Sequence, residues 1–162
     1  MCPNRVEISE TLGELKELAP AGYALGFHVQ FTTTKFLFQT YKKEWLDFYS
    51  QQGLVMADPI VAWCFENTGK LRWSELHDPE GVLNKAADYG LAYGMVCATE
   101  AVGSRSMGGF ARSDREFTDA EMDQIFESFE KLHVATADQA SLTDDTVQQL
   151  KKMSVMVTHP GS

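Results

Sequence analysis

Two pairs of strand-like runs, each pair joined by a short turn, limit the folds open to this chain more than any other feature. Aromatic and aliphatic residues dominate residues 23–31 and 35–40, with a polar threonine turn between the two runs. Residues 93–99 and 106–111 repeat the arrangement around a turn that contains Gly103. Runs of this composition, separated by turn residues, predict two β-hairpins.

Segments of helical period flank and separate the hairpins. Apolar residues recur at intervals of three and four within residues 8–19 and, most regularly, within residues 118–136. The remaining expected elements are helices over residues 42–52 and 79–89, a helix that starts at Asp58-Pro59, and a short edge strand over residues 70–75. This mixed order predicts an α+β fold: an α/β/α sandwich with a central antiparallel sheet of about five strands and helices on both faces.

The helix that follows residue 57 has a well-defined start. Asp58 is a strong N-cap residue, and the proline after it is tolerated at the first helical position. The inward face of this helix is expected to carry Ile60, Val61, Cys64 and Phe65.

Length and charge exclude several classes of function. The chain has 162 residues, 44% of them hydrophobic, with 14 Lys+Arg against 23 Asp+Glu and a net charge of −9. Roughly 100 to 200 residues build one compact core, so we expect one soluble domain. Its acidity argues against binding nucleic acid or anionic membrane unaided. No apolar run approaches the roughly 20 residues that span a bilayer, and no signal peptide is recognisable, which predicts a cytoplasmic protein.

Cofactor and metal motifs are missing from the sequence. There is no phosphate-binding glycine motif, and the four histidines lie too far apart to suggest a metal site. The three cysteines, Cys2, Cys64 and Cys97, are an odd number without CxxC spacing, which favours reduced thiols over disulfides or zinc ligands. We therefore expect no cofactor, no metal ion and no catalytic residues, and we interpret Cys64 as a packed helical cysteine.

The residues most suggestive of function are aromatic. Tyr41, Trp45 and Tyr49 follow one another at intervals of four, with Trp45 and Tyr49 on one face of the helix expected over residues 42–52 and Tyr41 one turn earlier, and Asp58 and Trp73 come from the next segments. These side chains could form ordinary core with Asp58 as an ordinary N-cap, or they could line a cavity for a small molecule. Buried phenol and indole groups need hydrogen-bond partners, which weakens the first interpretation.

The same residues carry a family resemblance. Tyr41, Trp45 and Tyr49, followed by the Asp58-Pro59 pair and by Trp73, resemble the signature of the autoinducer-binding domain of LuxR-type quorum-sensing regulators. Residues 89–94 are similar to the glycine turn before the fourth strand of that family. The resemblance covers roughly residues 5–137. It implies an autoinducer-binding domain over residues 1–137.

The resemblance implies a ligand and a role for each polar residue. The ligand would be an N-acyl-homoserine lactone, held between the sheet and the helices on one face. Trp45 would donate its indole N–H to the lactone carbonyl, Asp58 would accept the amide N–H, and Tyr41 would donate to the acyl carbonyl. Tyr49 and Trp73 would form walls around the ring and the amide. A neutral amide and a lactone buried together need every hydrogen bond, each unmade bond costing roughly 1 to 3 kcal/mol.

The acyl chain would lie in a channel of smaller and apolar residues. The side chains expected along it are Ala24, Gly26, Phe38, Val61 and Leu91. The chain departs from the family near this channel, because Val82 and Leu83 stand where relatives often carry paired aromatic residues. Recognition of the ring survives that change, whereas the preferred acyl length is left open.

The end of the chain carries the last prediction. Residues 138–162 resemble a linker and the start of a helix-turn-helix domain whose recognition helix is absent from this sequence. The expected partners are therefore the lactone, a second copy of the chain in a homodimer, and DNA only through a helix-turn-helix domain. The sequence fits a receptor domain excised from a longer protein or a naturally shortened receptor. Two alternatives stay open: a small lactone or amide hydrolase using Asp58 or Cys64, and a ligand-free dimerisation or inhibitory module.

Overall fold

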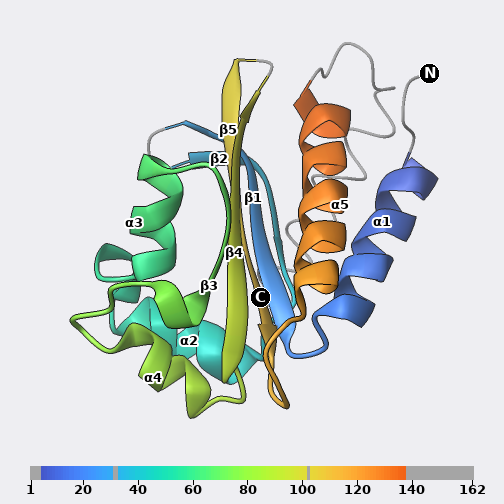
Figure 1. Ribbon diagram of the computed structural model, residues 1–162. Helices are drawn as coiled ribbons and strands as arrows, with labels where there is room; N and C mark the ends of the chain where they lie inside the picture. Colours follow the sequence, from blue (N-terminus) through green and yellow to red (C-terminus); the bar gives the residue numbers. More distant parts are fainter. Residues whose placement is uncertain (1–4, 31–32, 102, 138–162) are drawn as a thin grey trace.

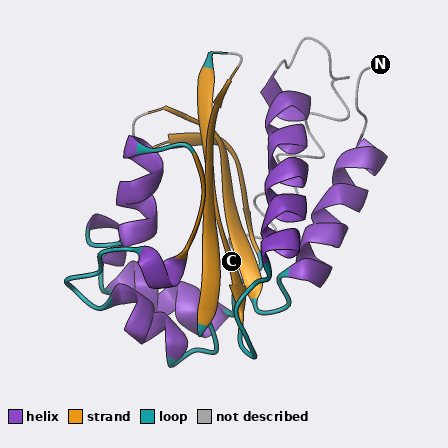
Figure 2. Ribbon diagram, in the orientation of Figure 1, coloured by secondary structure: helices purple, strands orange, loops and turns teal. Residues whose placement is uncertain are grey.

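The computed structural model describes residues 5–30, 33–101 and 103–137, which form a three-layer sandwich (Figure 1). A five-stranded sheet is the middle layer of this described part. Helices cover both of its faces (Figure 2): α1 (Arg5–Leu18) and α5 (Asp119–Ala137) on one, and α2 (Lys43–Gln51), α3 (Pro59–Glu66) and α4 (Val82–Ala87) on the other. The predicted α+β sandwich is confirmed.

The sheet joins the two predicted hairpins edge to edge. Its strands are β1 (Gly22–Gln30), β2 (Thr33–Gln39), β3 (Gly69–Arg72), β4 (Tyr93–Ala101) and β5 (Ser104–Arg112). Their order across the sheet is β2-β1-β5-β4-β3, and every neighbouring pair is antiparallel. Both hairpins are confirmed. The edge strand expected over residues 70–75 ends at Arg72, because the chain turns there into a 3-10 helix, Trp73–Glu75.

The predicted helices hold except in two details. The helix expected over residues 79–89 begins only at Val82, because Gly81 has a left-handed φ of 68°. The Asp78 carboxylate caps this helix, accepting the backbone N–H groups of Val82 and Leu83 at 2.9 Å each. Phe65, expected on the inward face of α3, is 48% exposed and is therefore only partly covered by the rest of the fold. The linker and helical start predicted within residues 138–162 lie outside the described residues.

The face of the sheet under α1 and α5 is filled with large apolar side chains. Phe27 of β1 and Phe129 of α5 are fully buried, with ring centroids 5.7 Å apart. The core cluster on this side, which we call the filled face, contains Ile8, Leu12, Leu15, Ala19, Tyr23, Leu25, Phe27, Phe36, Phe38, Met95, Cys97, Phe110, Phe117, Met122, Ile125, Phe129, Leu132 and Ala135. Burial on this scale makes the filled face the main source of hydrophobic stabilisation.

Helix α5 is fixed on the filled face by its N-terminal capping box. The Glu121 carboxylate accepts the backbone N–H of Thr118 at 2.9 Å, and the backbone N–H of Glu121 donates to the Thr118 hydroxyl at 3.1 Å. The carboxylate also binds both terminal nitrogens of Arg115, at 2.8 and 3.0 Å. Reciprocal bonds of this kind satisfy the unpaired N–H groups at the start of a helix.

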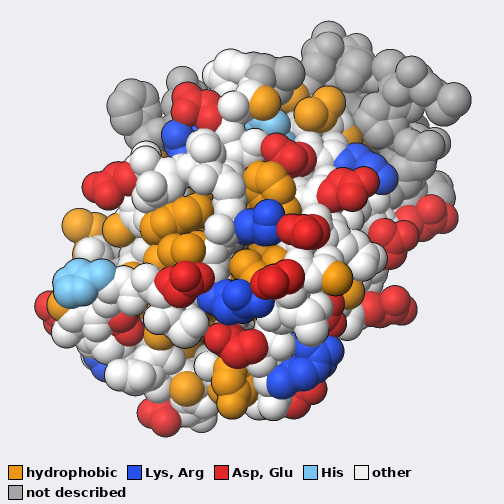
Figure 3. Space-filling view, in the orientation of Figure 1, with side chains coloured by type: hydrophobic (Ala, Val, Ile, Leu, Met, Phe, Trp, Pro, Cys, Tyr) orange, Lys and Arg blue, Asp and Glu red, His pale blue; other side chains and the backbone are white. Residues whose placement is uncertain are grey.

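The surface mixes charges of both signs. On the side of the molecule in Figure 3, lysine and arginine side chains lie next to acidic ones. A guanidinium nitrogen of Arg72 lies 2.7 Å from a carboxylate oxygen of Asp119, and Lys70 Nζ lies 3.0 Å from a carboxylate oxygen of Asp123. These ion pairs connect β3 to α5. Among the described helices, none is long and apolar enough to cross a membrane.

Candidate functional site

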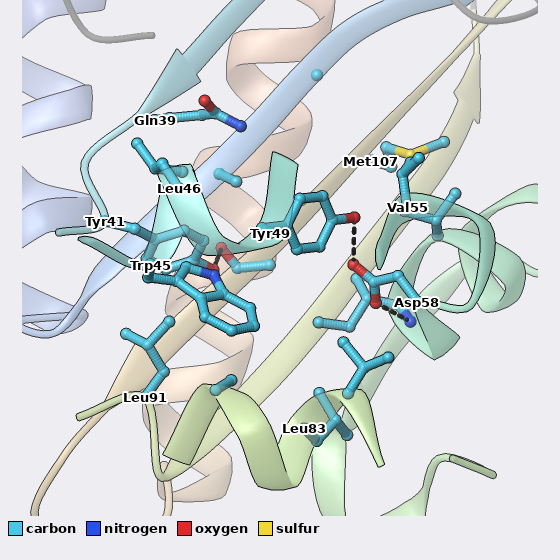
Figure 4. Close-up of a pocket in the computed structure, with 18 of the residues that line it drawn as sticks. Gln39, Tyr41, Trp45, Leu46, Tyr49, Val55, Asp58, Leu83, Leu91 and Met107 are labelled. Atoms are coloured by element: carbon cyan, nitrogen blue, oxygen red, sulfur yellow. Dashed lines mark hydrogen bonds between the residues drawn. The ribbon is translucent and has the colours of Figure 1, made fainter. Parts of the chain in front are cut away.

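A cavity of about 530 Å³ lies between the sheet and the layer formed by α2, α3 and α4. Its size is within the roughly 300 to 1,000 Å³ of small-molecule sites. Figure 4 shows side chains from the sheet and from all three helices directed into it. The lining residues are Ala24, Gly26, Val29, Leu37, Gln39, Tyr41, Trp45, Leu46, Tyr49, Val55, Met56, Asp58, Ile60, Val61, Phe65, Trp73, Val82, Leu83, Ala86, Leu91, Met107, Gly108 and Gly109.

Small residues on the strands create the room for this cavity. Ala24 of β1 pairs with Gly109 of β5 on one side and with Gln39 of β2 on the other. A Cβ atom built on Gly109 would lie 3.4 Å from the Tyr41 hydroxyl, so even one methyl group would close part of the space. The same strands that fill one face of the sheet with phenylalanine therefore leave the other face open.

Asp58 is the acidic centre of the site. One carboxylate oxygen accepts the backbone N–H of Ile60 at 2.9 Å, which confirms the predicted N-cap of α3. The other oxygen accepts the Tyr49 hydroxyl at 2.8 Å (Figure 4). Burial raises the pKa of the Asp58 carboxyl above its usual value, while the hydrogen bonds from Tyr49 and the α3 backbone oppose that rise. The helix cap thus brings a partly desolvated hydrogen-bond acceptor to the wall of the cavity.

Two phenol groups stand beside this acceptor. The Tyr41 hydroxyl donates to the Gly109 carbonyl at 3.1 Å, which ties the start of α2 to the sheet. Burial, and then the charge of Asp58, raise the pKa of both Tyr41 and Tyr49. Both hydroxyls therefore stay protonated and act as donors over the physiological pH range.

The two tryptophans form walls of the cavity in different ways. The centroid of the Trp45 ring lies 5.7 Å from that of Tyr49 and 5.5 Å from that of Tyr89. The Trp45 indole N–H has no hydrogen-bond partner among the described residues. The Trp73 ring packs directly on Gly94 of β4, where an added Cβ atom would lie only 2.1 Å from the ring. Its Nε1 is buried and also has no partner within the described part of the chain.

The structure gathers the predicted site residues around one cavity, with a single exception. Phe38 does not line it. Phe38 pairs with Leu25, and both side chains point to the filled face, where the Phe38 ring lies 6.1 Å from that of Phe27. The prediction was wrong because side chains alternate along a strand, and the cavity side of β2 belongs to the neighbours of Phe38.

Those neighbours, Leu37 and Gln39, are lining residues that the sequence analysis missed. The pairing of Gly26 with Leu37 and of Ala24 with Gln39 places both residues on the cavity side, but this register belongs to the folded sheet and no local signal in the sequence states it. The same holds for Val29. The register of β1 shifts between Gly26 and Val29 around His28, which has a positive φ of 59°, and this bulge turns Val29 to the cavity side.

Cys64 lies outside the cavity. Its side chain is fully buried, it is absent from the lining, and its Sγ donates to the Cys97 carbonyl at 3.5 Å. Burial raises the pKa of the Cys64 thiol to about 12. A protonated thiol without access to the cavity is poorly suited to attack a molecule bound there, which supports the interpretation of Cys64 as a packing residue.

The cavity opens to solvent beside η1 (Leu54–Met56) and the end of α3. Val55, Met56 and Phe65 line it although their side chains are 50%, 91% and 48% exposed. Besides Asp58, hydrogen-bonding side chains at the walls are few, and apolar side chains line most of the rest of the cavity and its mouth.

Comparisons with known proteins point to one family. The family described as "Autoinducer binding domain" matches residues 16–137. No curated protein sequence matches significantly. The N-acylhomoserine lactone-dependent LuxR-family transcription factor CepR2 of Burkholderia cenocepacia has a similar structure (TM-score 0.62, 16% identity), over 85% of this chain and 90% of that one.

Structures of SdiA are also similar. Escherichia coli SdiA aligns with a TM-score of 0.60 and 16% identity, over 98% of this chain and 86% of that one. SdiA in complex with octanoyl-rac-glycerol aligns with a TM-score of 0.58 and 18% identity, over 84% of this chain and 63% of that one. At these identities the structural likeness shows a shared fold.

Proposed function

The chain belongs to the autoinducer-binding domain family of LuxR-type regulators, and from this premise we propose that its cavity binds an N-acyl-homoserine lactone. The observation that carries the proposal is the division of the cavity. Hydrogen-bonding groups of Tyr41, Trp45 and Asp58 lie at its walls, and apolar side chains line most of the remainder. A ligand with a polar head and an aliphatic tail matches that division.

Each polar group has a matching atom in the lactone. Asp58 accepts the ligand amide N–H, because a carboxylate offers about four lone-pair sites and the structure occupies two. The unpartnered indole N–H of Trp45 donates to the lactone carbonyl. The Tyr41 hydroxyl turns from the Gly109 carbonyl to the acyl carbonyl. Tyr49 and Trp73 enclose the ring and the amide.

The rest of the cavity accommodates the acyl chain. Ala24, Gly26, Val61 and Leu91 contact it, together with Val82 and Leu83 of α4. Val82 and Leu83 are aliphatic, so α4 presents apolar side chains to the acyl chain and no aromatic ring at these two positions.

Ligand binding is the sensing step of a regulator in this proposal. The occupied cavity completes the layer formed by α2, α3 and α4, which stabilises the domain and promotes a homodimer. Transcription is then controlled through a helix-turn-helix domain, without catalysis by this domain. A naturally shortened receptor would instead form dimers without binding DNA.

The first test is thermal unfolding with lactones of several acyl lengths. A ligand that binds only the folded domain stabilises it by about 2.7 kcal/mol at a hundredfold excess over its dissociation constant, so a clear rise in melting temperature is expected. Octanoyl glycerol serves as a second ligand class, since it is the ligand in one of the similar SdiA structures. If no lactone changes the melting temperature, the proposal fails, and stabilisation by the glycerol ester alone would assign the cavity to acyl glycerols.

Asp58→Asn tests the amide contact. Asparagine is an equally good N-cap, so folding should survive. Loss of a charged acceptor lowers lactone affinity by about ten- to a hundredfold. Asp78→Asn is the matched control, because the Asp78 carboxylate also accepts backbone N–H groups at the start of a helix, α4, but does not line the cavity. Unchanged affinity in Asp58→Asn would remove the proposed contact.

Mass analysis of a lactone incubated with the domain tests the hydrolase alternative. The lactone is expected to remain intact. Ring-opened or deacylated product that accumulates beyond the amount of protein, and disappears in Asp58→Asn, would replace the sensor proposal with a catalytic one.

A further inference from the structure

Gln39 at the end of β2 is a polar side chain that the proposed ligand contacts leave unused. It lines the cavity, and Figure 4 shows its carboxamide directed from the strand toward the interior beside Leu46. Its side chain makes no hydrogen bond with another described residue. The lining residues nearest to it in the sheet register, Ala24 and Leu37, offer no polar side-chain atom. A carboxamide in such surroundings has both donor and acceptor capacity to spare.

The sheet register fixes where this carboxamide lies relative to the ligand head. Gln39 pairs with Ala24, and Ala24 pairs with Gly109, whose carbonyl accepts the Tyr41 hydroxyl. Gln39 and Ala24 thus belong to the same cross-strand row as the backbone group that holds Tyr41. Neighbouring strands lie about 4.8 Å apart, so Gln39 is two strand spacings away from Gly109. Between them lies only Ala24, whose small side chain leaves room for the ligand.

We propose that Gln39 recognises a hydrogen-bonding group, an oxo or a hydroxyl, on the third carbon of the acyl chain. This inference rests on the proposed function, in which Tyr41 binds the carbonyl at the first carbon. The third carbon is two bonds further along the chain, over Ala24 and toward β2. The carboxamide N–H donates to an oxo group, and the carboxamide can donate to a hydroxyl or accept from it.

An unsubstituted chain in the same position leaves the carboxamide against methylene groups. The substituted ligand therefore gains one hydrogen bond with the Gln39 carboxamide. The unsubstituted ligand displaces water from the carboxamide and gives it no hydrogen bond in return. A net hydrogen bond of ordinary strength corresponds to a preference of about five- to tenfold. Gln39 is a specificity-determining residue in this proposal and takes no part in holding the lactone ring.

The test compares binding of three lactones of equal chain length by calorimetry: unsubstituted, 3-oxo and 3-hydroxy. The wild-type chain should prefer both substituted forms by about five- to tenfold. Gln39→Leu should bring the three affinities together without loss of the unsubstituted ligand. Gln39→Glu supplies acceptors only, so it should reject the 3-oxo form and keep the 3-hydroxy form. Gln51→Leu, the same change at an exposed residue of α2 that does not line the cavity, is the control and should leave the ratios unchanged.

The outcomes separate this inference from the function on which it rests. Equal affinity of the wild-type chain for all three lactones, or an unchanged preference in Gln39→Leu, overturns the role of Gln39 while lactone binding stands. Failure of all three lactones to bind overturns both. Melting temperatures of the variants without ligand show whether each one folds, and a fold lost in Gln39→Leu leaves Gln39→Glu to decide.

Discussion

The two faces of the central sheet are built from the same strands but carry side chains of very different size. On β1, Leu25 and Phe27 point to the filled face, whereas Ala24 and Gly26 point to the cavity. On β5, Phe110 belongs to the filled face and Gly109 to the cavity. Each face is covered by a layer of helices (Figure 1), so the presence of helices alone does not explain the difference.

The filled face and the cavity face of the sheet therefore make different contributions to the domain. A face packed with fully buried rings supplies stability, because large apolar groups are removed from water and fit together closely. A face of alanine and glycine forgoes part of that stabilisation and gains a cavity. Under the proposed function, the filled face holds the fold and a bound ligand completes the packing of the opposite face.

The largest effect on stability is expected from opening a space in the filled face. Phe27→Ala removes a fully buried ring that contacts Phe38 and Phe129, and it should lower the free energy of unfolding by about 3 to 5 kcal/mol. Urea unfolding measures this. Lactone affinity of the molecules that remain folded should change little. A loss below about 1 kcal/mol would mean that the filled face is not the main source of stability.

The next largest effect is expected where the cavity wall touches the sheet. Gly94→Ala places a methyl group 2.1 Å from the Trp73 ring, so the ring must move. Overpacking of this kind costs about 1 to 3 kcal/mol, and displacement of the Trp73 wall should also lower lactone affinity. Thermal unfolding and calorimetry report the two effects.

Gly13→Ala is the matched control for that substitution. Gly13 lies in α1, and a Cβ atom built there meets nothing within 4 Å. Alanine should therefore stabilise the helix by roughly 0.5 to 1 kcal/mol. The comparison between the faces would be contradicted if Gly94→Ala proved as harmless as Gly13→Ala.

A smaller effect is expected at the capping box of α5. Glu121→Ala removes the acceptor for the Thr118 N–H and should cost about 1 kcal/mol without changing lactone affinity. The exposed Glu127 of the same helix is the control, and its substitution by alanine should cost less than about 0.5 kcal/mol.

This contribution should also depend on pH. Arg115 and the Thr118 N–H lower the pKa of Glu121 from its ordinary 4.5 to about 2. A lowered carboxyl pKa stabilises the fold fully above the unfolded-state value, and the stabilisation is lost as pH falls through the folded-state value. Unfolding curves of the wild type and Glu121→Ala should converge as the pH falls from 4.5 toward 2. A constant difference over that window would exclude the ionised Glu121 as the cause.

The smallest effect on stability is expected from filling the cavity. Ala24→Leu adds apolar atoms to an open space, so the free energy of unfolding should change by less than about 1 kcal/mol. Lactone affinity should nevertheless fall at least about tenfold, since the added side chain occupies the proposed path of the acyl chain. Calorimetry checks this, and unchanged affinity would place the acyl chain elsewhere.

Local signals in the sequence were sufficient to predict much of the site. The Asp58-Pro59 pair specified the start of α3 by capping chemistry that depends on a few adjacent residues. The interval of four put Trp45 and Tyr49 on one side of α2 and Tyr41 just before its start, and all three line the cavity. Such features are set by short-range geometry, which a sequence states directly.

Errors arose where the position of a side chain depended on the face of a strand. Phe38 was expected at the cavity and lies on the filled face. Gln39, the next residue in the chain, lines the cavity and was not predicted to do so. Alternation along β2 gives two sets of residues, but nothing local says which set meets which helices. That choice follows from the register with β1, which pairs Leu25 with Phe38.

By itself, then, the sequence determined the helices, the hairpins, the cap at Asp58 and the residues that carry the family signature. Only the tertiary structure decided that Val29 turns to the cavity, that Cys64 is closed off from it, and that small residues of β1 and β5 meet to leave it open. The physical reason is distance along the chain. Ala24 and Gly109 become neighbours only when strands from the two hairpins pair, and a bulge at His28 resets the faces of β1 within that pairing.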